Sequence, residues 1–239
     1  MITLDDLKTN RDTQITVACI AFFLVAFPLY FSMQGGNASG SGAMGGVADY
    51  NVNGELTYVQ IADGIEYIAD GDTLMIDDLH TDSVDGAEDM NIVGVRVTMS
   101  YGEDETTDPS LPAGCVGPAG GQNADDTITG SATHLNFTES NDGQNGGQNS
   151  GHEVAVEWFN SSMVGATVSE LTESEIVNQI DSMGAGLGIY SIEIGVVAES
   201  GNAPGPACSR SDAGEEVTYS VELIIFDYTI APAFDEAEL

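Results

Sequence analysis

The sequence predicts a mainly β protein, in which a single N-terminal transmembrane helix precedes an antiparallel β-sandwich with one short helix. Three observations lead to this fold class. Residues 15–33 are uniformly apolar, most of the remaining chain consists of short segments rich in β-branched and aromatic residues, and turn residues separate these segments. Because the strand-like segments follow one another closely, an antiparallel sandwich is favoured over alternating βαβ units. An immunoglobulin-like topology is one candidate for it.

The apolar run at residues 15–33, ITVACIAFFLVAFPLYFSM, contains no charged side chain. About 20 helical residues span the roughly 30 Å hydrocarbon core of a bilayer, so this run is long enough to cross. Lys8 and Arg11 precede it, and the next basic residue is Arg96, so residues 1–14 are expected in the cytoplasm. A cleaved secretory signal is the alternative. Signal cores hold about 7 to 15 apolar residues, which favours a retained anchor here.

A segment rich in Gly, Ser and Ala, residues 34–46, follows the apolar run and is expected to be a flexible linker. Residues 47–239 are enough for one extracytoplasmic domain with its own core. Strands are expected at residues 56–61, 73–76, 92–100, 133–137, 153–159, 188–199 and 216–230. Apolar and polar residues alternate most regularly in the last of these. The low-complexity residues 138–151 are expected to form a mobile loop.

One helix is expected to interrupt the strands. Thr172 can cap its N-terminus, and Glu175, three residues on, completes a capping box. Four apolar residues then share one helix face: Ile176, Val177, Ile180 and Met183. Gly184 is expected to end the helix, because glycine commonly follows the last helical residue.

The charge balance is strongly acidic because basic residues are nearly missing. Four Lys and Arg stand against 39 Asp and Glu, which gives a net charge of −35. The electrostatic screening length falls from about 8 Å at 0.15 M salt to about 3 Å at 1 M, so salt makes such a charge tolerable. A halophilic, archaeal source is the economical explanation, and an acidic extracellular protein of a marine or mesophilic cell is the alternative. Nucleic acid is excluded as a partner, because binding it requires basic groups.

Two cysteines lie outside the apolar run, Cys115 and Cys208, each in a stretch rich in Gly and Pro. In an oxidising exterior compartment two cysteines are expected to pair, so we predict a Cys115–Cys208 disulfide, with two free thiols as the alternative. Three Asn-x-Ser/Thr sequons make Asn37, Asn136 and Asn160 candidates for glycosylation outside the cell.

Calcium is the best chemical hypothesis for a bound ion. Four carboxylates crowd a short span, Asp70, Asp72, Asp77 and Asp78, and calcium takes six to eight oxygen ligands. The spacing does not match an EF-hand loop, and a solvated acidic loop is the default alternative. No other cofactor is expected. The sequence has no Gly-x-Ser-x-Gly nucleophile elbow, and its glycines lie in polar tracts instead of a phosphate loop, so we expect no enzyme.

These observations predict a single-pass membrane protein that displays an acidic β-domain outside the cell. The domain is expected to act as a structural or interaction module of the cell envelope. Its partners would be the membrane, through the N-terminal helix, and either another protein or further copies of the chain at the cell surface. An exported hydrolase is a third and less favoured hypothesis.

A hydrophobic N-terminal helix followed by a β-rich acidic head resembles the layout of archaeal type IV pilins and archaellins, whose helices bundle into a filament core. The resemblance implies a filament subunit as the alternative function. In those precursors a small residue follows the basic residues at the cleavage point, whereas here Arg11 is followed by Asp12.

Overall fold

The computed structural model describes residues 22–23, 46–102, 105–107, 121–145, 150–203 and 208–233. The chain divides into two units, residues 1–46 and residues 47–239. The predicted cytoplasmic segment, transmembrane helix and linker lie outside the described residues, apart from the helical pair Phe22 and Phe23 and the single residue Gly46. In the part that is described, no helix combines the length and the apolar character required to cross a bilayer.

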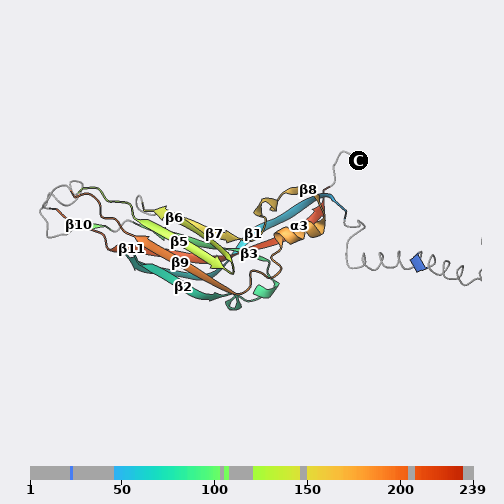
Figure 1. Cartoon of the computed structure of the whole chain (residues 1–239), viewed down its shortest axis with the longest axis horizontal. Coiled ribbons are helices and arrows are strands. Elements are labelled where there is room, and N and C mark those ends of the chain that lie inside the picture. The colour runs from blue at the N-terminus through green and yellow to red at the C-terminus, as the bar shows by residue number, and fades with distance from the viewer. Residues whose placement is uncertain are drawn as a thin grey trace, which may run out of the picture. The chain divides into compact units, whose positions relative to one another are not determined.

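The second unit is mainly β, as the sequence predicts, and its described residues form two large antiparallel sheets and one α-helix. One sheet contains β1 (Ala48–Ala69), β3 (Ile92–Tyr101), β7 (Ser150–Glu157), β8 (Thr167–Leu171) and β11 (Gly214–Pro232). The other contains β2 (Thr73–His80), β5 (Thr127–His134), β6 (Phe137–Gln144) and β9 (Ile189–Val197). Their strand orders are β7–β3–β11–β1–β8 and β2–β9–β5–β6 (Figure 1). The immunoglobulin-like topology stays a prediction.

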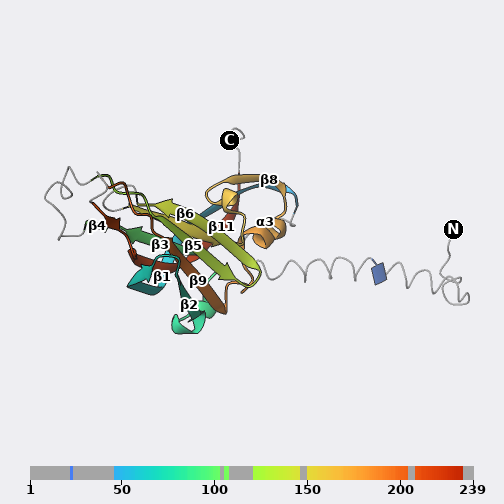
Figure 2. The same ribbon diagram turned by 60° about the vertical axis from the view of Figure 1, so that its left-hand side comes forward.

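Shorter elements complete the unit. A small ribbon pairs β4 (Thr106–Thr107) with β10 (Arg210–Ser211) at one end of the sheets (Figure 2). Among the described residues the helices are η2 (Thr81–Ser83), η3 (Ala87–Asp89), η6 (Ser161–Met163) and α3 (Glu173–Ile180), of which the first three are single 3₁₀ turns.

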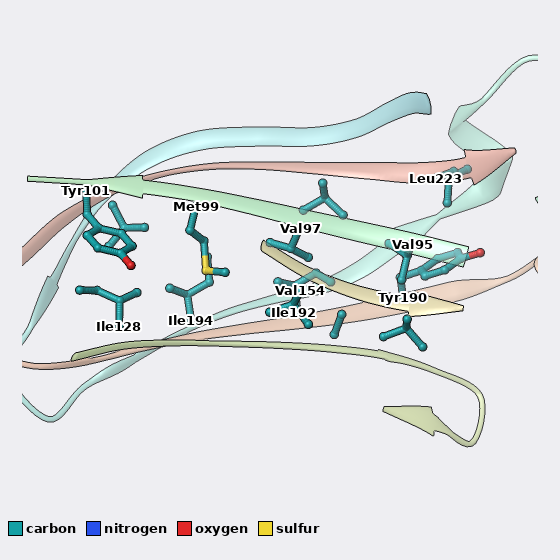
Figure 3. Close-up of a cluster of buried hydrophobic side chains, with 14 of the residues drawn as sticks. Val95, Val97, Met99, Tyr101, Ile128, Val154, Tyr190, Ile192, Ile194 and Leu223 are labelled. Carbon is teal, nitrogen blue, oxygen red and sulfur yellow. The ribbon is translucent and has the colours of Figure 1, made fainter. Parts of the chain in front are cut away.

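Alternate side chains of the two sheets fill one hydrophobic core between them, because successive residues of a strand point to opposite faces. The side chains labelled across this core in Figure 3 are Val95, Val97, Met99, Tyr101, Ile128, Val154, Tyr190, Ile192, Ile194 and Leu223. They come from β3, β5, β7, β9 and β11. The two sheets therefore pack face to face, and each keeps an outer face turned away from the core.

A second, smaller core covers the outer face of the five-stranded sheet near its β8 end. Ile176 and Ile180 of α3 are fully buried there against Val52 of β1 and Phe226 of β11. The predicted capping box is confirmed: Thr172 Oγ1 accepts a hydrogen bond from the N–H of Glu175, whose carboxylate accepts one from the N–H of Thr172.

The helix ends earlier than the sequence predicts. Asp181 is its C-cap, and the Asp181 carboxylate accepts the N–H of Met183 at 2.7 Å, a local turn that competes with helical hydrogen bonding. Met183 has a left-handed φ of 53° and is 67% exposed, so its predicted place on the apolar helix face was wrong. Gly184 lies beyond the helix.

Two further expectations for the strands need correction. The predicted strand at residues 133–137 spans the end of β5, a two-residue turn and the start of β6: His134 pairs with Phe137, and Leu135 between them has φ 53°. The stretch 138–151 was expected to be a loop, but residues 138–144 belong to β6 and pair with β5. Its polar side chains are compatible with a strand because β6 is the outer strand of its sheet.

β1 and β11 are the longest described strands of the unit, and they pair with each other. β1 pairs with β11 along nearly its whole length, from Tyr50 opposite Pro232 to Ala69 opposite Gly214. One β-bulge interrupts the register, because Gln60 and Ala62 face neighbouring β11 residues and Ile61 has no partner in that strand. This pairing joins the main core and the smaller core under α3.

Candidate functional site

The carboxylates predicted to bind calcium lie at two separate places. Asp70 and Asp72 belong to the turn between β1 and β2, where the Asp70 carboxylate accepts the N–H of Ala198 at 3.0 Å. Asp77 and Asp78 lie further along β2, about 16 Å from Asp72 at the usual rise of a strand. Within the described ranges, no three His, Cys, Asp or Glu side chains are placed to share a metal ion. The calcium site stays a prediction without structural support.

The cysteine and sequon predictions are only partly within the described residues. Cys208 is disulfide-bonded, and Cys115, its predicted partner, lies outside the described residues, so the pairing stays a prediction. Asn37 lies outside as well. Asn136 is exposed in the β5–β6 turn, whereas the Asn160 amide donates to Gln179 at 3.0 Å and accepts from a neighbouring serine. Glycosylation at Asn160 would disrupt the hydrogen bond to Gln179.

A buried ion pair holds the β4–β10 end of the domain. The Arg210 guanidinium donates to the Glu105 carboxylate at 2.7 Å, and the side chains are 8% and 0% exposed. Glu105 also accepts the backbone N–H groups of Gly201 and Ala124. Burial alone would raise the pKa of Glu105, but Arg210 and the two amides favour the charged form and lower it below its ordinary value.

A second polar cluster lies near this ion pair. Asn145 donates to the carboxylates of Asp126 and Glu215, at 3.1 Å and 2.7 Å, and all three residues are buried. One oxygen of Asp212, Oδ2, is buried without a hydrogen-bond partner. Burial, followed by the charges of Asp126 and Glu105, raises the pKa of Asp212. The hydrogen bonds of these side chains connect the loops to the ends of the sheets.

The three histidines do not converge on one site. The fully buried His134 ring stacks on Tyr190 at 4.2 Å between centroids, and its nitrogens contact the carbonyl oxygens of Ile189 and Ala185. His152 contacts the Tyr101 hydroxyl at 2.9 Å, and burial lowers the pKa of His152. Their contacts are those of packed and hydrogen-bonded structural side chains.

The outer face of the five-stranded sheet carries an ordered set of polar side chains. The strand registers place Thr98 opposite Ser220 and Ser100 opposite Thr218, so four hydroxyl side chains occupy two neighbouring rows. On β1, Asp63 faces Ser220 and Ile65 faces Thr218. Together these residues line a shallow hollow of about 350 Å³. The side chains at the centre of this hollow are small and mostly uncharged, and β1 forms one of its borders.

Arg96 and the side chains that contact it lie beside the hollow. The Arg96 guanidinium donates to Glu222 at 2.6 Å and lies 3.7 Å from the ring centroid of Tyr58 on β1. Glu153 of β7 is 4.0 Å away. Arg96 and Glu222 are each less than a quarter exposed, so both charges of this pair are largely engaged by the sheet itself. Tyr58 is 43% exposed and thus presents a substantial part of its side chain to solvent.

The edge of β1 that faces away from β11 has no partner strand over most of its length in the described part of the chain. β8 pairs with β1 only between Ala48 and Asn51, and Val52 then donates its N–H to Ala166 on that side at 2.9 Å. Beyond Val52, no strand in the described part of the chain pairs with this side of β1. β1 is therefore an edge strand from Asn53 onward.

The hydrogen-bonding groups on this open side follow from the register. N–H groups of alternate strand residues point to the same side, so those of Leu56, Tyr58 and Gln60 point the same way as that of Val52. The bulge shifts the alternation by one residue, after which Asp63 and Ile65 direct their N–H groups outward. None of these five N–H groups has a hydrogen-bond acceptor among the described residues.

Comparison with known proteins gives no family assignment: no protein-family model and no curated protein matches the chain. The sequence prediction identified only residues 56–61 of β1, and missed its edge position. The signal that could have revealed it is the run 48–69, whose tyrosines, valines and isoleucines recur at strand spacing. Glycines at positions 54 and 64 and acidic side chains within the run obscured that pattern.

Proposed function

We propose that this chain is a membrane-anchored protein that displays its acidic β-domain at the cell surface as a structural or interaction module. The observation that carries the proposal is the combination of a 19-residue apolar run in the sequence with a domain whose longest strand has an open side. The polar outer face and the unpaired backbone groups of β1 offer a surface for another protein. The anchor would attach the domain to the outer side of the membrane.

Protease treatment of intact cells that produce the protein tests this placement. An external protease should remove residues 47–239 while leaving a small fragment that contains the apolar run in the membrane fraction. The control is the same treatment of lysed cells, which exposes both sides. Full protection of the domain in intact cells would refute the proposed orientation.

A filament subunit is the second candidate, favoured by the apolar N-terminal run in front of a β-rich head. N-terminal sequencing of the mature chain separates the two functions. Cleavage just before Ile15, together with filaments in electron micrographs, would support a pilin-like or archaellin-like subunit. An intact Met1 on a chain that extracts as single molecules in detergent would support the anchored module.

A further inference from the structure

We propose that the open side of β1 receives an additional strand, an extended polypeptide segment with basic side chains that belongs to a partner protein. The inference rests on the proposed function as an interaction module, and it names the partner's chemistry and the place where it binds. Strand addition needs a continuous row of unpaired backbone donors and acceptors at a sheet edge.

The edge has the length that strand addition requires. From Asn53 to Glu66 it extends about 45 Å at about 3.3 Å per residue, far more than the 5 or 6 residues of an average strand. β8 already occupies the first part of the same side, at Ala48 to Asn51. An added strand would continue the edge position that β8 leaves, and it would extend the sheet without displacing any described element.

Charge decides which kind of strand fits. Glu55, Asp63 and Glu66 lie along the open stretch, and all three are exposed. Among the described residues of the neighbouring sheet face, Arg96 is the only arginine or lysine, and it is already bound by Glu222 and covers Tyr58. A basic strand would place opposite charges beside these carboxylates, whereas an acidic one would place like charges there.

The same charges argue against a second copy of this chain as the occupant. Pairing β1 with β1 of another copy would bring the same three carboxylates into one interface, and like charges across strands are destabilising. The bulge at Ile61 would also have to be matched by a second bulge. A basic partner segment meets neither obstacle.

The test titrates the full-length chain in detergent with a synthetic peptide of about twelve residues, long enough for most of the edge. In this peptide lysine alternates with valine and threonine. Residue-resolved amide hydrogen exchange is the readout. We expect exchange to slow by about fivefold or more at the outward N–H groups of Tyr58 and Ile65, and to change little at Thr57 and Val59, which already bond to β11.

Two control peptides separate strand addition from attraction to an acidic surface. Replacing lysine with glutamate should abolish the protection. Replacing alternate valines with proline keeps the charge but removes backbone donors, so it should also abolish the protection at the edge. Equal protection by the proline peptide, or slowing spread evenly over the domain, would overturn the proposal.

A pair of variants at Ile65 tests the edge itself. Ile65 is 61% exposed, and its N–H points outward, so Ile65→Pro removes an edge donor with little loss of packing. Ile65→Thr keeps the N–H and a β-branched side chain, and is the matched control. We expect the lysine peptide to bind Ile65→Pro about tenfold more weakly and Ile65→Thr within about twofold of the parent. Equal binding to both variants would refute strand addition here.

Thermal unfolding of the peptide-free variants establishes that Ile65→Pro is folded. If it is not, the double variant Asp63→Asn, Glu66→Gln replaces it, and weaker binding at 0.15 M salt that matches the parent at 1 M supports the charge argument. No salt-dependent difference would overturn it.

Protection at Tyr58 and Ile65 that rises with protein concentration alone would identify a second copy as the occupant and overturn the basic partner. Protease accessibility on cells is measured separately, so either proposal can fail alone.

Discussion

Replacing Arg210 with methionine should destabilise the domain far more than the same replacement at Arg96. The Glu105 carboxylate is 0% exposed and the Arg210 side chain 8%, so the variant leaves a buried carboxylate without its guanidinium partner, although the backbone N–H groups of Gly201 and Ala124 still donate to it. Breaking a buried pair from one side costs about 3–5 kcal/mol. We therefore expect Arg210→Met to lose about that much free energy of unfolding at pH 7.

The loss should depend on pH in a defined direction. In the parent chain the pKa of Glu105 is lowered by Arg210, so its contribution to stability is present above the ordinary glutamate pKa and is lost as the pH falls through the folded value. Without Arg210, burial favours the protonated acid. The difference in free energy of unfolding between Arg210→Met and the parent should therefore shrink as the pH falls through the range in which Glu105 is protonated in the variant and still charged in the parent.

Urea unfolding of the full-length chain in detergent measures these changes. Trp158, the single tryptophan, packs against the main core and reports unfolding by its fluorescence. The matched control is Arg96→Met, because Arg96 and Glu222 are 24% and 22% exposed, so water can still solvate the glutamate left behind and the loss should be smaller. Salt should reduce the effect at Arg96 and leave that at Arg210 nearly unchanged. Equal losses at the two arginines would refute the argument from burial.

Three further variants test other parts of the description by the same unfolding assay. Asp212→Asn should raise stability at pH 7 because the raised pKa of Asp212 means that its charged form opposes folding; the gain should vanish near pH 4, and a loss at pH 7 would contradict this sign. Thr172→Ala should cost about 1 kcal/mol and Thr172→Ser little, because only the former removes the cap on Glu175; equal costs would argue against the capping box. Tyr228→Phe should cost about 1.5–3 kcal/mol by removing the hydrogen bond to the Asp181 carboxylate. If Tyr228→Phe costs the same stability when Asp181 is already alanine, the loss comes from packing instead of this hydrogen bond.

Local patterns in the sequence predicted the elements better than their arrangement. The alternation at residues 216–230 identified β11, and the Thr172–Glu175 spacing identified the start of α3, because both depend on nearest neighbours along the chain. The end of α3 was missed because a side chain, Asp181, replaced the expected glycine as the terminating group.

The candidate site depends on pairing between distant segments, which local patterns do not specify. β1 becomes an edge strand because β11, about 160 residues away, occupies one side of it and β8 covers only its start. The buried Glu105–Arg210 pair likewise joins residues 105 apart in sequence. Acidic residues were numerous enough that no pattern distinguished Glu105 from its solvated neighbours. Its low exposure follows from the fold alone.

The distribution of basic residues connects the stability of the domain with the partner that we propose for it. Lys8 and Arg11 precede the apolar run, so Arg96 and Arg210 are the only basic residues at positions 47–239 apart from histidines. Both are held in ion pairs with glutamates. Two arginines cannot neutralise all the carboxylates of the domain, so solvent ions or a partner must balance the rest of the negative charge. A partner with basic side chains would therefore be attracted to the domain without competing against an internal ion pair. In our proposal it binds along the open side of β1, where exposed carboxylates and unpaired backbone groups lie together.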